Sequence, residues 1–190
     1  VEKMKNARHL YFIGCGTSYH AASVGAVYFA QLAGRAVIPV LAPQFIPQYA
    51  PTVNHEDVGI FVSQSGETKD VLNALEAAEK RGMACFGLAN VVGSTLTKAT
   101  SFCLPLCCGY EISVPATKTF TNQVVTFLYL AYRLARKDTS ELLRIPELME
   151  QTIEMVGPQI EAIAKDINEW NDMYCLGYGA TYPIALEGAL

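Results

Sequence analysis

Positive charge is scarce and scattered in this sequence. Its 190 residues carry 14 Lys and Arg against 18 Asp and Glu, which gives a formal net charge of −4. Proteins that bind nucleic acid usually gather basic side chains on one face, and no such cluster is present. We therefore predict no nucleic-acid partner, and we expect any anion site to be local and built from backbone dipoles.

Long apolar runs are also missing. No run approaches the ~20 residues that span a bilayer, and no signal-peptide pattern opens the chain. We therefore expect no membrane partner and a cytoplasmic location. The first residue is Val1 rather than Met, so we expect an excised or processed N-terminus.

Metal-ligand spacings are absent as well. The three histidines are scattered, and the six cysteines show no C-x-x-C pair. We predict no metal site, and we expect free, buried cysteines in a reducing compartment. The cysteines are Cys15, Cys85, Cys103, Cys107, Cys108 and Cys175.

Short apolar runs alternate with amphipathic segments. Strands are predicted at 9–14, 36–41, 58–62, 84–88 and 102–106, and helices at 18–33, 68–81 and 118–135. Strands that are apolar throughout and followed by helices indicate a parallel sheet covered on both faces. We predict an α/β fold, a three-layer doubly wound sheet of five parallel strands in flavodoxin-like order. Ligands of such sheets bind beyond the carboxyl ends of the strands.

An internal repeat suggests how the chain is divided. The segment 11–19, a strand with a G-x-G turn and a helix start, recurs at 174–182 with both glycines and a Tyr retained. We predict a first domain over 1–137 and a helical connection over 138–171 that packs on it. This connection should be broken near Pro146 and Gly157-Pro158. Residues 172–190 should be the first strand and helix start of a second, truncated domain.

The candidate site lies where the third predicted strand meets a helix, at Ser-Gln-Ser-Gly-Glu-Thr, 63–68. The first amides of a helix and its dipole attract anions, so hydroxyls at this position indicate a phosphate site. An ordinary capped turn explains the same residues, and Glu67 and Asp70 would repel an anion. Thr17 and Ser18 begin another helix beside the first strand. In the predicted order they would face 63–68, which favours the phosphate interpretation.

Four segments together resemble a known family from about residue 9 onward. They are Cys15–Ala21, Ser63–Thr68, Glu111-Ile112 with Val114 and Thr117-Lys118, and Tyr182–Leu190. They resemble the isomerase half of the glutamine–fructose-6-phosphate amidotransferases, also called glucosamine-6-phosphate synthases. That half consists of two sugar isomerase (SIS) domains in tandem. The resemblance implies that this chain is the first SIS domain and the start of the second.

The resemblance also implies a set of contacts for a sugar phosphate, either fructose 6-phosphate or glucosamine 6-phosphate. Phosphate would be held by Ser63, Ser65 and Thr68 with Gln64 beside them, the sugar would be contacted by Thr17 and Ser18, and the backbone near Val114 would close the site.

For the whole enzyme the resemblance implies synthesis of glucosamine 6-phosphate from fructose 6-phosphate and glutamine-derived ammonia. It implies no cofactor, a homodimer, and two partners for this segment, a second SIS domain and a glutaminase domain. The family's catalytic Lys, Glu and ring-opening His lie past Leu190. We therefore expect no catalytic residue in this fragment, which should bind the sugar phosphate without turning it over.

One departure leaves alternatives open. The family usually has Ala-Ser before Thr-Lys, whereas this chain has Pro115-Ala116, so one hydroxyl contact is absent. An amino-sugar phosphate deaminase or deglycase is one alternative. A non-catalytic sugar-phosphate sensor is another, although the start of a second SIS copy favours the enzyme.

Overall fold

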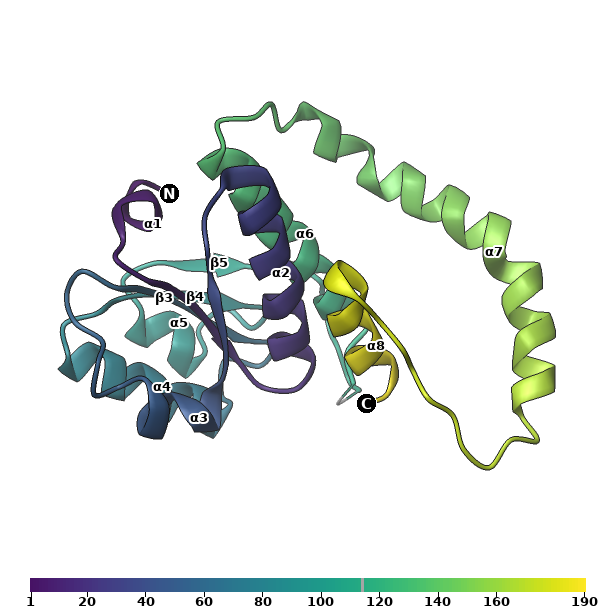
Figure 1. Ribbon diagram of the computed structural model, residues 1–190, viewed down its shortest axis with the longest axis horizontal. Coiled ribbons are helices and arrows are strands. Elements are labelled where there is room, and N and C mark those ends of the chain that lie inside the picture. Colours follow the sequence, from purple (N-terminus) through teal and green to yellow (C-terminus); the bar gives the residue numbers. More distant parts are fainter. Residues whose placement is uncertain (114) are drawn as a thin grey trace.

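A five-stranded parallel sheet forms the centre of the molecule (Figure 1). The computed structural model describes residues 1–113 and 115–190. The strands run in the order β2-β1-β3-β4-β5, so the predicted flavodoxin-like order is confirmed. Their bounds are β1 Leu10–Gly14, β2 Ile38–Leu41, β3 Val58–Ser63, β4 Ala84–Ala89 and β5 Cys103–Pro105. Because β1 pairs with both β2 and β3, the point where the strand order reverses lies between β1 and β3.

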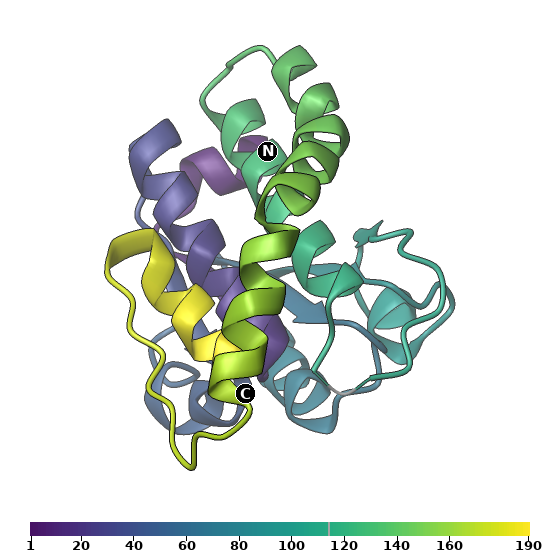
Figure 2. The same ribbon diagram turned by 90° about the vertical axis from the view of Figure 1, so that its right-hand side faces the viewer.

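Helices cover both faces of the sheet, which confirms the predicted three layers (Figures 1 and 2). Helices α2 and α6 pack with one face, and α3, α4 and α5 pack with the other. The helix bounds are α1 Glu2–Asn6, α2 Thr17–Ala33, α3 Ala42–Gln48, α4 Lys69–Lys80, α5 Thr95–Ala99 and α6 Lys118–Leu134. Every residue of β1 and of β3 is buried, as expected for central strands with covered faces.

Helices α2 and α6 lie close together because α2 carries a glycine at their contact. A Cβ on Gly25 would come within 2.6 Å of Cγ of Phe127 in α6. Phe127 also stacks on Phe12 of β1, with the ring centroids 4.4 Å apart. This packing fixes the middle of α2 relative to the middle of α6.

At the opposite end of the sheet, a buried carboxylate ties the strand starts together. Asp57, which is fully buried, accepts hydrogen bonds from the Arg8 guanidinium and from the backbone N–H groups of His9 and Asn54. Burial raises the pKa of Asp57, but the hydrogen bonds from Arg8 and the backbone outweigh it, so the pKa lies below its usual value. Arg8 and His9 are thereby held away from the carboxyl ends of the strands.

The segment after α6 departs from two predictions. It forms the 3₁₀ helix η1, Ser140–Arg144, and the helix α7, Ile145–Ile167. Pro146 lies in the first turn of α7, where its missing N–H costs nothing, but α7 continues through Pro158. The predicted break at Gly157-Pro158 is therefore wrong. Figure 1 shows that α7 bends along its length, which is the usual accommodation of an interior proline.

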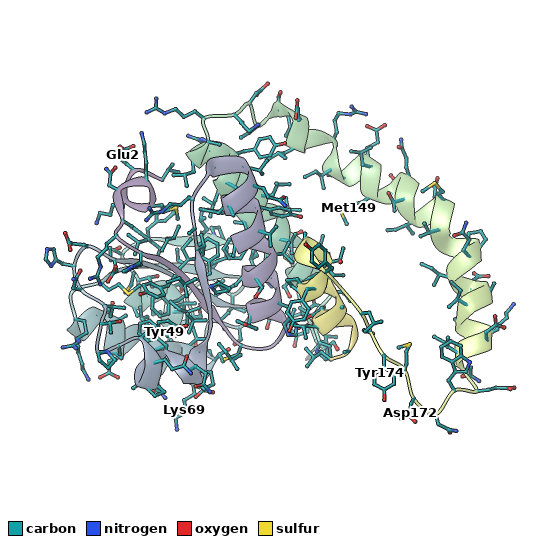
Figure 3. The ribbon with its side chains drawn as sticks, viewed as in Figure 1. Glu2, Tyr49, Lys69, Met149, Asp172 and Tyr174 are labelled. Atoms are coloured by element: carbon teal, nitrogen blue, oxygen red, sulfur yellow. The ribbon has the colours of Figure 1, made fainter. Side chains whose placement is uncertain are left out.

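Helix α7 does not pack on the domain, so the prediction that 138–171 does so is also wrong. None of its residues is buried. Its first turns face α6 across a groove of about 770 Å³, and Met149 points toward that groove (Figure 3). Both sheet faces are already covered by other helices, so they offer α7 no apolar surface. Among the described residues, no helix is both long and apolar enough to cross a bilayer.

Residues 172–190 form a short 3₁₀ helix, one α-helix and no strand. The first strand expected within 172–190 is absent: residues 173–178 have no regular secondary structure, because the described part of the protein places no strand beside them to supply hydrogen bonds. Figure 3 shows Asp172 and Tyr174 along this segment, away from the sheet. The 3₁₀ helix η2, Gly179–Thr181, leads into α8, Tyr182–Gly188, which lies against α2 (Figure 2). The division of the chain into domains stays a prediction.

Candidate functional site

The turn between β3 and α4 is fixed by the hydroxyl of Ser63, the last residue of β3. Its Oγ accepts a hydrogen bond from the Gly66 backbone N–H at 3.0 Å and lies 2.8 Å from Oγ1 of Thr68. Gly66 has a φ of +69°, a left-handed conformation that glycine adopts without strain. The carbonyl of Gly66 accepts from the N–H of Leu96, which ties the turn to α5. The turn is therefore rigidly shaped before any ligand is bound.

The N-terminus of α4 has no side-chain cap. Thr68 occupies the N-cap position with extended backbone, but its hydroxyl contacts Ser63 rather than an amide of the helix. The interpretation of 63–68 as an ordinary capped turn therefore does not describe this helix start. The free amides in the first turn of α4, together with the helix dipole, can bind an anion.

The carboxylate of Glu67 is turned toward α5. Its Oε1 accepts a hydrogen bond from the Thr95 backbone N–H at 2.8 Å. This hydrogen bond from the Thr95 backbone holds the pKa of the exposed Glu67 carboxyl below its usual value. The negative charge of Glu67 thus lies at the start of α5 rather than at the start of α4, where it would repel an anion. Asp70 stays exposed in the first turn of α4.

Ser65 and Gln64 are half-buried between these anchors. Oγ of Ser65 accepts from the Glu67 backbone N–H at 3.1 Å, which leaves its O–H to donate. The Gln64 carbonyl accepts from the N–H of Asn90, so the backbone at this position is held to the segment after β4. The hydroxyls of Ser63, Ser65 and Thr68 therefore belong to one compact turn, as the sequence predicted.

At the start of α2, Thr17 is engaged by a residue that sequence reasoning missed. Thr17 is buried, and its hydroxyl donates to Oε1 of Glu187 in α8 at 2.8 Å. The other oxygen of Glu187 lies 2.7 Å from Nδ1 of His20. The hydroxyl of Thr17 thus points to α8 in this structure. The signal for this partner in the sequence was a Glu within the recurring segment that begins at 174.

Ser18, also buried, is paired with a second missed residue. Oγ of Ser18 accepts a hydrogen bond from Nε2 of Gln123 in α6 at 3.1 Å. Gln123 is fully buried, and its Oε1 has no partner among the described residues. The signal in the sequence was a polar residue four positions before Phe127, on the apolar face of a predicted helix.

The segment before α6 supports that helix. Thr117 is its N-cap, and Glu111 accepts from the Thr119 backbone N–H through Oε2 at 3.1 Å. Lys118 donates through Nζ to the Tyr110 carbonyl at 2.6 Å. Ala116 is buried. Val114, predicted to close the site through its backbone, lies outside the described residues.

The six cysteines differ in burial. Only Cys85 is buried, and burial raises the pKa of its thiol to about 12. The expectation that all six are buried is wrong: Cys107 is exposed because β5 already ends at Pro105, and the other four are half-buried. In the described ranges, no three His, Cys, Asp or Glu side chains gather as a metal site would require.

The fold and this β1–β3 site define the class of protein. The SIS domain family model matches residues 3–133, and the chain belongs to that family. The resemblance noted in the sequence is also confirmed. The chain is 40% identical over 192 residues to the glutamine–fructose-6-phosphate aminotransferase (isomerizing) of Aquifex aeolicus, which covers 99% of this chain and 32% of the relative. The corresponding enzyme of Pyrobaculum aerophilum is 39% identical, covering 97% of this chain and 31% of its own length.

A solved structure agrees with these relatives. The C-terminal domain of glucosamine-fructose-6-phosphate aminotransferase from Francisella tularensis superposes with a TM-score of 0.84 at 25% identity, covering 99% of this chain and 56% of that one. The chain thus spans about a third of the length of the curated relatives it matches.

Proposed function

We propose that this chain is the sugar-phosphate-binding part of an isomerizing glutamine–fructose-6-phosphate aminotransferase. In the whole protein, fructose 6-phosphate would be converted to glucosamine 6-phosphate with ammonia from glutamine. A glutaminase domain, a second SIS domain and a second copy of the enzyme are the partners that this proposal includes. The names and the identity of the curated relatives support the assignment.

One observation carries the ligand assignment. The β3–α4 turn holds three hydroxyls over a helix start that no side chain caps, while Glu67 is held away by Thr95. A phosphate dianion fits this arrangement, since the amides of the first turn of α4 and the O–H of Ser65 can all donate to it. Thr17 and Ser18, in the first turn of the helix that follows the neighbouring strand β1, would then contact the sugar.

Calorimetric titration of the chain with fructose 6-phosphate tests this assignment. Charge-assisted hydrogen bonds contribute about 1.5–3 kcal/mol each, so Ser65→Ala should weaken binding roughly ten- to hundredfold. Unphosphorylated fructose should not bind detectably. Ser101→Ala is the matched control, because Ser101 precedes β5 at the opposite end of the sheet.

Two outcomes would contradict the proposal. Equal binding of fructose and fructose 6-phosphate would show that phosphate is not recognised. Equal losses in the Ser65→Ala and Ser101→Ala variants would show that the β3–α4 turn is not the phosphate site. Glucosamine 6-phosphate is the second ligand to titrate. A clear preference for it would favour an amino-sugar phosphate deaminase or deglycase, which the buried Ala116 leaves possible.

A further inference from the structure

Gln123 is the most unusual polar residue of the buried interior. Its amide lies between α6 and the start of α2, donating to Ser18 through Nε2 while Oε1 has no partner in the described part of the chain. A buried amide oxygen without a hydrogen bond is costly, and a Met or Leu at this position would avoid that cost. Local rules broken in this way are often found at functional sites.

The hydrogen bond from Gln123 determines what the Ser18 hydroxyl can do. Since Nε2 of Gln123 is a donor, Ser18 must accept through Oγ, and its hydrogen is directed elsewhere. The close packing of Gly25 on Phe127, one turn of α6 beyond Gln123, keeps this geometry from relaxing. Ser18 lies in the first turn of α2, which follows β1, and β1 pairs with β3. Its O–H is therefore available as a donor on the β1 side of the candidate site.

We propose that Gln123 is a positioning residue that fixes the Ser18 hydroxyl as a donor to the sugar of the bound sugar phosphate. This inference rests on the proposed function. Gln123 itself is buried and contacts no ligand, so it acts only through Ser18. Gln123 lowers the stability of the fold through its unpaired Oε1, and it raises the affinity of the site for the sugar phosphate.

A double-mutant cycle in fructose 6-phosphate binding tests the inference. A neutral hydrogen bond contributes about 0.5–1.5 kcal/mol, so Ser18→Ala and Gln123→Met should each weaken binding roughly three- to tenfold. Because both changes remove the same donated hydrogen bond, the double variant should bind no more weakly than Ser18→Ala alone. If Gln123→Met fails to fold, Gln123→Asn takes its place. It keeps an amide but withdraws it from Ser18, so it should weaken binding to the same extent.

Thermal unfolding separates positioning from a merely structural role. Gln123→Met removes the unpaired oxygen, so its melting temperature should equal or exceed that of the unaltered chain. Leu130→Ala is the control in the same helix: Leu130 is buried but has no part in the Gln123–Ser18 contact, so the variant should melt earlier and bind fructose 6-phosphate with unchanged affinity.

Unchanged affinity in Gln123→Met, or losses of affinity that multiply in the double variant, would overturn this inference and leave the proposed function standing. Failure of the unaltered chain to bind fructose 6-phosphate would overturn the proposed function, and the inference with it.

Discussion

Gly66 is the residue at which the β3–α4 turn tolerates change least. Its φ of +69° disfavours any other residue, and a Cβ at this position would lie 2.0 Å from Oγ of Ser94. Gly93 has a similar φ of +85°, but a Cβ there would meet no atom within 4 Å. We expect Gly93→Ala to lower the free energy of unfolding by about 1–2 kcal/mol, and Gly66→Ala by at least about 1 kcal/mol more. Urea unfolding of both variants measures the difference.

The excess cost at Gly66 should come from Ser94, and this can be checked separately. The double variant Gly66→Ala with Ser94→Gly removes the clashing hydroxyl and its Cβ, so it should recover most of the excess over Gly93→Ala. Equal costs for the two single alanine variants would mean that the turn shifts to admit a side chain, and the rigid turn described above would be wrong.

Site residues from one continuous segment were predictable, whereas their partners were not. Ser63, Ser65 and Thr68 share a turn, so their spacing alone brings the hydroxyls together. Gln123 meets Ser18 across 105 positions of the chain, and Glu187 meets Thr17 across 170. Contacts over such separations depend on which helices become neighbours, and hydrophobic periodicity does not specify that.

At the scale of elements, α7 stands apart from the other long helices. Its 23 residues include Gly157 and Pro158, and no residue of it is buried. Isolated helices are marginal in water, and most helix stability in proteins comes from packing. We expect backbone amides of α7 after Pro158 to exchange hydrogen at least about a hundredfold faster than those of α2 and α6. Hydrogen exchange followed by mass spectrometry on the chain measures this.

Protection of α7 equal to that of α2 would contradict this expectation and would indicate that the helix is covered in solution. Repeating the measurement at a tenfold lower protein concentration distinguishes the two ways of covering it. Protection that falls on dilution means contact with a second copy, and unchanged protection means that α7 folds back on its own domain.

The elements that the sequence predicted correctly are those whose burial is dictated by the sheet. Strands β1 and β3 are apolar on both faces, and α4 and α6 each have one apolar face, so pattern and packing agree. The strand expected at the start of 172–190 repeats the pattern of β1 and did not form, because a strand requires hydrogen-bonding neighbours as well as apolar side chains. Helix α7 formed, but its expected packing on the domain did not, because the two faces of the sheet are already covered by other helices.

At the scale of the whole molecule, Glu187 joins the last helix to the start of the first βα unit. Its two oxygens contact Thr17 and His20, and the side chains of Glu187 and His20 are only 15% and 12% exposed. Glu187→Gln keeps an acceptor for Thr17 but removes the negative charge beside His20. We expect this variant to lose about 1 kcal/mol, which lowers the melting temperature of a protein of this size by about 2–4 °C.

Glu161→Gln on the exposed α7 makes the same change of net charge without altering a contact, and it should melt like the unaltered chain. If both variants melt alike, α8 is not fastened to α2 by Glu187.

A specific loss in Glu187→Gln would have a consequence for the candidate site. Thr17 would then be held by a residue of the recurring segment, so the geometry of the β1 side of the site would depend on α8. The β3–α4 turn, whose hydrogen bonds lie within 63–68 or reach Asn90 and α5, would not depend on α8. Phosphate recognition and sugar recognition would then respond differently to changes in the last helix.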